Sequence, residues 1–235
     1  MKSSYVSISD VAKQIRGVSY NGQEAIKESR DKYLPILRAN NILDGEILYE
    51  DLLYVPEKYI SETQILRRND IVIAASSGSM TVVGKAAQIK NDFKGSFGAF
   101  CKVLRPNSDI DSRYLSYFFK TPYYRQTISS FASGANIYNL RNEHVDNLKI
   151  FLPPRSVQEQ IVSILSKVES SLEKRRQTIR LAEEFLKSAF LEMFGDPLRN
   201  NKGWKLSKGE EYSDLITVGV VIRPASYYVS KGVVA

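Results

Sequence analysis

Residues 156–194, SVQEQIVSILSKVESSLEKRRQTIRLAEEFLKSAFLEMF, decide the fold that the sequence predicts. Apolar residues recur there at alternating steps of four and three, and nine of the ten positions in the series are apolar or Ala. This period predicts the seam of a helix that pairs with another helix. The seam consists of Ile161, Leu165, Val168, Leu172, Arg175, Ile179, Ala182, Leu186, Ala189 and Met193.

Both ends of this helix carry sequence signals. Pro153-Pro154 cannot lie in a helix interior. Ser156 with Glu159 predicts a capping box at the start, and Gly195 predicts the stop. At 1.5 Å per residue the predicted rod is about 58 Å long. We expect it to need a partner helix, from a second chain or from another part of the same protein.

Two alternatives concern this helix. An amphipathic helix can instead pack its stripe on its own domain, although long helices with a sustained seam usually pair. Arg175 is the single polar seam residue. It either fixes the register of a helix pair or extends its charge to the edge of the seam.

The composition limits the class of protein. A chain of 235 residues with 43% hydrophobic residues can build one large or two modest domains. Cys101 is the only cysteine, which excludes an internal disulfide and fits a reducing compartment. No apolar run approaches the roughly 18 residues of a membrane helix, and no export signal follows Met1. We therefore expect a cytoplasmic protein without a membrane partner.

The net charge of +7 is unevenly distributed. The helix from Ser156 to Phe194 has equal numbers of basic and acidic residues, whereas Thr63–Arg141 has eleven basic and four acidic residues. Concentrated positive charge favours a polyanionic partner, with DNA or RNA first. The alternative is a generally basic protein with no such partner.

Ahead of the long helix, strands and short helices are mixed without a regular βαβ order, which predicts an α+β fold. Pro35 favours an edge position for its strand. The predicted domains are a globular domain over 1–152, the long helix over 153–195, and over 196–235 a linker with the start of a shortened second repeat. Strands are predicted at 33–37, 71–75, 81–86, 97–104 and 148–152, and helices at 111–119 and 123–131.

The sequence offers few residues for catalysis. His144 and Cys101 are each the only residue of their type, so no zinc site or Cys-His pair is predicted, and no metal or cofactor is expected. The segment from Gly78 to Lys85 is close to a phosphate-binding loop. However, five residues separate Gly78 from Gly84 where that motif has four, and Ala86 replaces the Ser or Thr that would hold magnesium. A nucleotide-binding enzyme using this loop remains an alternative.

Two polar loops are candidates for nucleic-acid recognition. Asn, Arg, Ser and Thr side chains read base edges, while Lys and backbone amides hold phosphates. Each loop taken alone is also consistent with an ordinary solvated turn. The residues predicted to contact DNA are Arg38, Asn40, Ser76, Ser77, Gly78, Ser79, Lys85, Arg125, Ser133, Gly134, Asn136, Tyr138, Asn139 and Arg141.

The junction before the helix resembles a known family. Ile150-Phe151-Leu152-Pro153-Pro154, followed by Gln158-Glu159-Gln160-Ile161-Val162 and Leu165, is similar to the segment that opens the conserved helix of the specificity subunit of type I restriction-modification systems. The strand at Asp70–Ala74, the Gly134 loop and Trp204 also resemble that family. The resemblance extends over roughly residues 5–206, and the proline-to-helix junction is its specific part.

The resemblance implies a subunit without enzyme activity. Each recognition domain in that family reads half of a split site in double-stranded DNA, and long helices pair antiparallel as a spacer. The subunit docks methyltransferase subunits, which bind S-adenosylmethionine, and the complex can recruit restriction subunits.

The family usually has two recognition domains and two long helices in one chain, whereas one of each is recognisable here. We expect either a half-subunit that forms a homodimer or a shortened form. A coiled-coil scaffold with an incidental basic head is the alternative. The residues predicted for dimerisation are Ile161, Leu165, Val168, Leu172, Arg175, Ile179 and Leu186.

Overall fold

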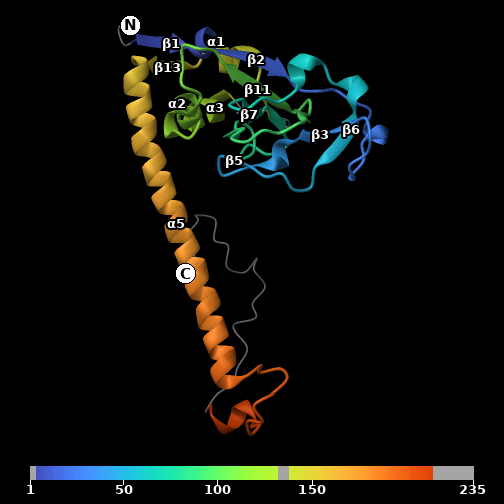
Figure 1. The fold of residues 1–235 in the computed structure, drawn as a ribbon, viewed down its shortest axis with the longest axis vertical. Helices are drawn as coiled ribbons and strands as arrows, with labels where there is room; N and C mark the ends of the chain where they lie inside the picture. The colour runs from blue at the N-terminus through green and yellow to red at the C-terminus, as the bar shows by residue number, and fades with distance from the viewer. Residues whose placement is uncertain (1–3, 132–137, 214–235) are drawn as a thin grey trace, which may run out of the picture. The chain divides into compact units, whose positions relative to one another are not determined.

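The structure is a computed structural model that describes residues 4–131 and 138–213 (Figure 1). The chain divides into two compact units, one ending at Ser171 and one beginning at Leu172. The first unit mixes sheets and short helices, which confirms the predicted α+β class. The domain limits predicted at 152 and 195 stay predictions.

A four-stranded antiparallel sheet forms the centre of the first unit, in the order β2-β11-β7-β9. Every residue of β7 is buried. Because neighbouring residues of a strand point to opposite faces, Ile71 and Ile73 pack into one hydrophobic core, and Val72 and Ala74 into another. Burial on both faces explains the unbroken apolar run. The strands are β2 (Ala12–Arg16), β7 (Ile71–Ala74), β9 (Ala86–Gln88) and β11 (Cys101–Pro106).

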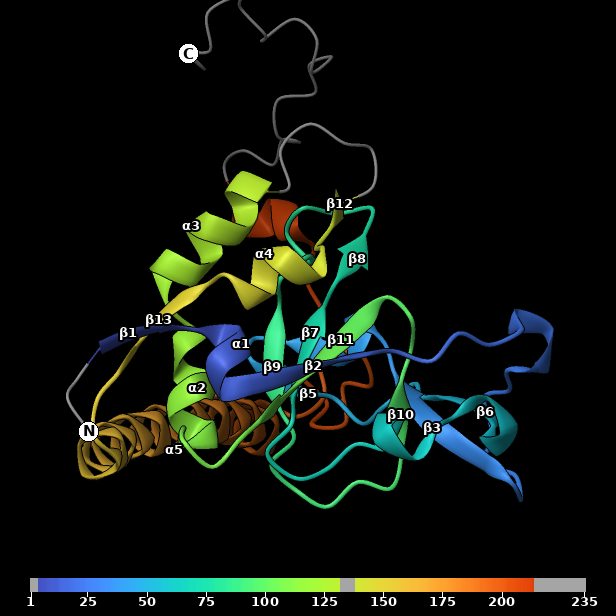
Figure 2. The same cartoon turned by 90° about the horizontal axis from the view of Figure 1, so that it is seen from above.

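Different elements cover the two faces of this sheet, as Figure 2 shows. The first core belongs to the helical side, with α1 (Ile8–Val11), α2 (Ser112–Phe118), α3 (Pro122–Phe131), α4 (Asn142–Asp146) and the antiparallel pair β1 (Ser4–Ser7) and β13 (Lys149–Leu152). The second core belongs to the other side, with β10 (Ser96–Phe97), β3 (Tyr33–Leu37), β6 (Leu53–Pro56), β4 (Ile42–Leu43) and β5 (Glu46–Ile47). Short 3₁₀ turns lie at Gly22–Glu24, Ala39–Asn41, Glu57–Tyr59, Glu62–Gln64 and Gly209–Glu211.

The position of β3 differs from the prediction, because β3 lies between β10 and β6 and not at an edge. Tyr54, which faces Pro35, exchanges both of its backbone hydrogen bonds with Ile26. The missing N–H of Pro35 is therefore not needed for pairing with β6. On the other side β10 pairs only from Ile36 onward. The proline falls where neither neighbour requires a donor.

The strand predicted at residues 81–86 is also wrong in its limits, because the chain turns over 80–84 and β9 begins at Ala86. Donors from α3 explain the turn. Arg125 donates to the carbonyls of Val83 and Met80 at 2.6 and 2.7 Å, and the buried Tyr124 hydroxyl donates to Gly84 at 2.8 Å. These side chains occupy carbonyl groups that a strand would use for pairing.

The long helix, α5, extends over Arg155–Phe194 and has 40 residues. It begins one residue before the predicted start. The amides of Val157 and Gln158 both donate to the Pro154 carbonyl. Ser156 therefore lies inside the first turn and not at the N-cap. At the other end Gly195 has φ +78° and donates its N–H to Leu191 at 2.8 Å, as expected of a glycine stop.

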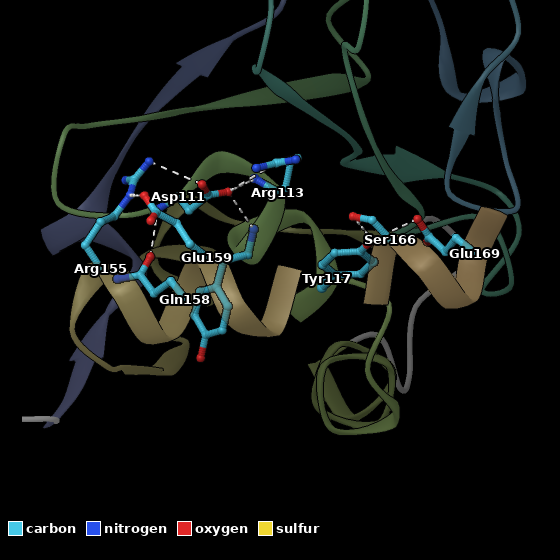
Figure 3. A network of polar contacts seen from close by, with 9 residues as sticks. Asp111, Arg113, Tyr117, Arg155, Gln158, Glu159, Ser166 and Glu169 are labelled. Carbon is cyan, nitrogen blue, oxygen red and sulfur yellow. Dashed lines mark hydrogen bonds and ion pairs between the residues drawn. The ribbon is translucent and has the colours of Figure 1, made fainter. Parts of the chain in front are cut away.

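Two sets of polar contacts fix the first turns of α5 against α2 (Figure 3). In the first, Asp111 caps α2 by accepting from the amides of Arg113 and Tyr114, and it forms an ion pair with Arg155 at 3.2 Å. The buried Gln158 accepts from the Asp111 amide at 2.7 Å and donates to the Pro153 carbonyl at 2.9 Å. Gln158 thus joins α5 to the residue before α2 and to the link between β13 and α5, in each case through a backbone group.

The second set lies farther along α5. The Tyr117 hydroxyl is hydrogen-bonded to Ser166 and Glu169, and Lys120 forms an ion pair with Glu169 at 2.7 Å. Burial raises the pKa of Glu169, but hydrogen bonds from Lys120 and Tyr117 outweigh it, so the pKa lies below its ordinary value. The stability from these bonds is therefore present at neutral pH and is lost as the pH falls through the lowered pKa. The two sets explain why the first unit includes α5 up to Ser171.

Gln158→Leu is expected to destabilise the first unit. The leucine has a similar size but leaves the Asp111 amide and the Pro153 carbonyl without their partner. An unpaired buried polar group costs about 1–3 kcal/mol. Chemical denaturation should show a loss of that order in the free energy of unfolding. Gln160→Leu, at an exposed position of the same helix, is the control. Equal stability of the two variants would contradict the role of Gln158.

The second unit contains the remainder of α5 and the turn after it. The Trp204 indole donates to the Phe194 carbonyl at 2.7 Å, and Asn200 exchanges two hydrogen bonds with the Trp204 backbone. These contacts fold the chain back on the end of the helix. Among the described residues of this unit, Trp204–Leu206 form no strand. The shortened second repeat stays a prediction.

Candidate nucleic-acid interface

Four of the predicted DNA-binding residues line one groove of the first unit. Its volume is about 690 Å³, and Arg38, Asn40, Ser76 and Ser77 contribute to its wall. Ser76 and Ser77 follow the end of β7, whereas Arg38 and Asn40 follow β3. Residues nearly 40 positions apart in the sequence therefore meet at one surface.

The base of the groove is built by close backbone contact. Val18 donates to the Phe97 carbonyl at 2.8 Å, and Gly98 donates to the Leu37 carbonyl at 2.9 Å. A Cβ atom at Gly17 would lie 2.0 Å from the Gly98 carbonyl oxygen, so only glycine fits there. These contacts bring the ends of β2, β3 and β10 together.

The two polar loops predicted from the sequence are residues 76–85 and 133–141, and the described end of the second lies next to the start of the first. Strands β8 (Ser76–Ser77) and β12 (Tyr138–Asn139) pair antiparallel, with Ser77 opposite Tyr138 and Ser76 opposite Asn139. The amide of Leu140 extends this pairing by donating to the Ala75 carbonyl at 2.8 Å. The predicted residues Ser133, Gly134 and Asn136 lie outside the described residues.

The loop from Gly78 to Lys85 has a defined polar structure. The Ser79 amide donates to the Ser77 hydroxyl at 3.1 Å, and the Ser79 and Thr81 hydroxyls lie 2.8 Å apart. A Cβ atom at Gly78 would meet nothing within 4 Å, so another molecule can approach the backbone there. Lys85 is half-buried after Gly84, which has φ +80°.

Most of the basic side chains between Thr63 and Arg141 already have a polar partner. Seven of its eleven basic side chains have a polar partner: Lys90, Lys102, Arg105, Arg113, Lys120, Arg125 and Arg141. The other four are Arg67, Arg68, Lys85 and Lys94, whose side chains make no hydrogen bond or ion pair within the described part of the chain. Of these four, only Lys85 was predicted to contact DNA.

The other basic residues predicted to contact DNA differ in how readily they could leave their present partners for a phosphate. Arg125 donates to the carbonyls of Met80 and Val83 and so supports the loop. Arg38 and Arg141 form ion pairs with Asp51 at 3.2 Å and Glu143 at 3.3 Å. Both acidic partners are well exposed, and such surface pairs contribute little, but Arg38 also donates to the Asp51 carbonyl at 2.8 Å, so Arg141 can yield to a phosphate contact more readily. DNA contact by each predicted residue stays a prediction.

Sequence reasoning missed the aromatic residues of the groove. Tyr20 lies outside every predicted element, and Phe100 lies inside the strand predicted at 97–104. That strand is interrupted, because the Cys101 amide donates to the Gly98 carbonyl at 2.8 Å and closes a turn. The sequence around Gly98 contains a glycine next to an aromatic residue, but nothing in it connects this turn with Arg38 or Ser76.

The loop does not have the structure of a nucleotide-binding site. A phosphate-binding loop opens a helix, whose N-terminus holds the phosphates. Here Lys85 leads into β9, a strand.

The lone cysteine and the lone histidine both have structural surroundings. Burial raises the pKa of Cys101 to about 12, so its thiol is neutral at physiological pH. His144 stacks on Phe131 with 4.6 Å between ring centroids, and its Nδ1 accepts from the Arg141 amide at 3.3 Å.

The described residues include no group of three or more His, Cys, Asp or Glu side chains that could hold a metal ion. Of the helices in residues 4–131 and 138–213, none is both long and apolar enough to cross a membrane.

Comparison with known proteins identifies a family. The family model for the type I restriction modification DNA specificity domain matches residues 2–181. The chain is 40% identical over 182 residues to the type I restriction enzyme StySPI specificity subunit of Salmonella potsdam. It is 41% identical over 182 residues to the EcoKI specificity subunit of Escherichia coli K12. Each alignment covers 76% of this chain and 39% of the relative, so the match spans about two fifths of their length.

Solved structures show the same fold. The HsdS subunit from Thermoanaerobacter tengcongensis aligns with a TM-score of 0.57 at 18% identity, covering 75% of this chain and 39% of that one. A chain from a study of complex assembly in the type I R-M system aligns with a TM-score of 0.59 at 20% identity, covering 81% of this chain and 45% of that one.

Proposed function

Because the chain belongs to the type I restriction modification DNA specificity domain family, we propose that it is a non-catalytic subunit that reads half of a bipartite site in double-stranded DNA. The observation that carries this proposal is the pairing of β8 with β12, which joins the described end of the second polar loop to Ser76 and Ser77 in the wall of the groove. The groove combines Asn and Arg side chains, which can contact base edges, with hydroxyl groups. The half-buried Lys85, without a partner in the described residues, supplies a charge for the phosphate backbone.

The proposal extends to partners. We propose that two chains pair through the seam of α5, and that the dimer docks methyltransferase subunits and, in a restriction complex, restriction subunits as well. The unpaired seam supports the dimer, since Val168, Leu172 and Ile179 are each about half exposed or more in the single chain. A role on genomic DNA supports a cytoplasmic location. A scaffold with an incidental basic head would instead bind DNA without regard to sequence.

Selection from a random duplex library tests the proposed function. The wild-type chain, alone and with methyltransferase subunits, is mixed with random-sequence duplexes, and the bound fraction is sequenced. We expect enrichment of one interrupted motif with two-fold symmetry, because identical recognition units in a symmetric dimer read identical half-sites. Binding without an enriched motif would favour the scaffold and reject the proposed function.

Lys85→Ala is expected to weaken binding to all duplexes. A variant that makes one phosphate contact fewer releases one counterion fewer when it binds DNA. The slope of log affinity against log salt should therefore become shallower by about one unit. Fluorescence anisotropy at several salt concentrations measures this slope. Lys90→Ala is the matched control, because Lys90 forms an ion pair with Glu46 at 2.6 Å. The same slope change in both variants would mean that Lys85 has no special position.

A further inference from the structure

An exposed aromatic side chain stands beside the proposed readers. Phe100 is 68% exposed, although large hydrophobic residues usually lie inside a protein. It lines the same groove as Asn40, Ser76 and Ser77. A lone exposed aromatic residue is unremarkable by itself. Its position within a surface of polar readers makes it informative.

The backbone of Phe100 is held firmly. Its carbonyl accepts from Ala75 at 2.8 Å and from Ser76 at 3.1 Å. The turn that carries it is closed by the bond from the Cys101 amide to the Gly98 carbonyl. The neighbouring Gly98 is itself bonded to Leu37. The exposed ring is therefore presented from a fixed backbone, and a contact has to order only its two side-chain torsions.

The chemistry of the ring limits what it can recognise in DNA. Phosphates and most major-groove base edges are polar, and the apolar group displayed in the major groove is the 5-methyl group of thymine. Resting on the proposed function, we infer that Phe100 is a specificity-determining residue that contacts a thymine methyl group at one fixed position of each half-site. The hydroxyls of Ser76 and Ser77, on the same wall, then face polar edges of neighbouring base pairs.

A thermodynamic cycle between protein and DNA tests this contact. The duplex enriched by the wild-type chain is made with each dT replaced singly by dU, which removes only the methyl group. Affinities are measured for the wild type and for Phe100→Ala. At one dT in each half-site, dU should weaken wild-type binding roughly fourfold, as expected for loss of one buried methyl group. The same replacement should leave the affinity of Phe100→Ala unchanged.

Two further variants separate folding and size effects. Tyr5→Ala removes an aromatic side chain of similar exposure, 73%, outside the groove, and should keep the full response to dU. Phe100→Leu retains an apolar side chain and should keep part of the response to dU. Thermal unfolding checks that each variant is folded.

The outcomes distinguish this inference from the proposed function. If dU has no effect at any position, or weakens the wild type and Phe100→Ala equally, Phe100 does not read a thymine methyl group and the inference is wrong. The enriched motif would then still support the proposed function. If the wild-type chain enriches no motif, the proposed function and this inference both fail.

Discussion

Leu172→Glu and Ile179→Glu are each expected to convert homodimers into monomers. Both side chains are exposed in the single chain, at 49% and 60%, so a charge there costs little in the monomer. In a paired helix the same charge would be buried next to an apolar partner, at a cost of several kcal/mol. In a two-fold dimer each substitution occurs twice. Sedimentation at micromolar concentration should show the loss of the dimer.

Ser170→Glu provides the control for these variants. Ser170 is exposed on α5 but lies outside the seam, so the added charge stays in water. This variant should remain dimeric and all three should keep the fold of the first unit. A wild-type chain that sediments as a stable monomer would contradict pairing through the seam.

Insertion of one heptad after Arg180 is expected to widen the gap between the two half-sites. Seven residues keep the seam in phase and lengthen the helix by about 10.5 Å. At about 3.4 Å per base pair this is near three additional base pairs. The half-sites themselves should not change, because the insertion leaves the recognition unit intact. Mapping of methylated adenines in cells that carry the variant and the methyltransferase subunits measures both quantities.

A four-residue insertion at the same point is the matched control. It shifts the apolar positions out of the heptad pattern and should harm dimerisation more than the longer insertion does. An active seven-residue variant with an unaltered gap would mean that the helix binds partners without setting the spacing. DNA bending reduces the change in the gap, and its contribution appears as a gap that grows by less than the added length.

The sequence predicts elements that depend on local patterns. The seam predicts α5, Ser156 places its start to within one residue and Gly195 places its end, and the apolar run from Ile71 predicts β7. The errors arise where distant side chains decide the backbone. Arg125 and Tyr124 take the carbonyls of the turn over 80–84, and Ile26 takes the hydrogen bonds of Tyr54 beside Pro35.

The candidate site was predictable only in part for the same reason. The polar loops could be found by composition, since Ser and Gly gather in residues 76–85 and Ser, Gly and Asn in residues 133–141. Their pairing through β8 and β12, and the approach of Gly17 to Gly98 that completes the groove, join segments far apart in the chain. No local period encodes such contacts. Phe100 was therefore found only in the three-dimensional structure.

The attachment of α5 has a consequence for how such a protein can change over generations. Gln158 holds the junction through the Asp111 amide and the Pro153 carbonyl, which exist whatever side chains the loops carry. Strand β11 separates the groove from the junction with α5, because Cys101 at its start lines the groove and Pro106 at its end leads toward Asp111. Under the proposed function, substitutions at Asn40 or Ser77 would alter the preferred DNA without disturbing this junction. New sequence preferences could then be acquired while the attachment of α5 is inherited unchanged.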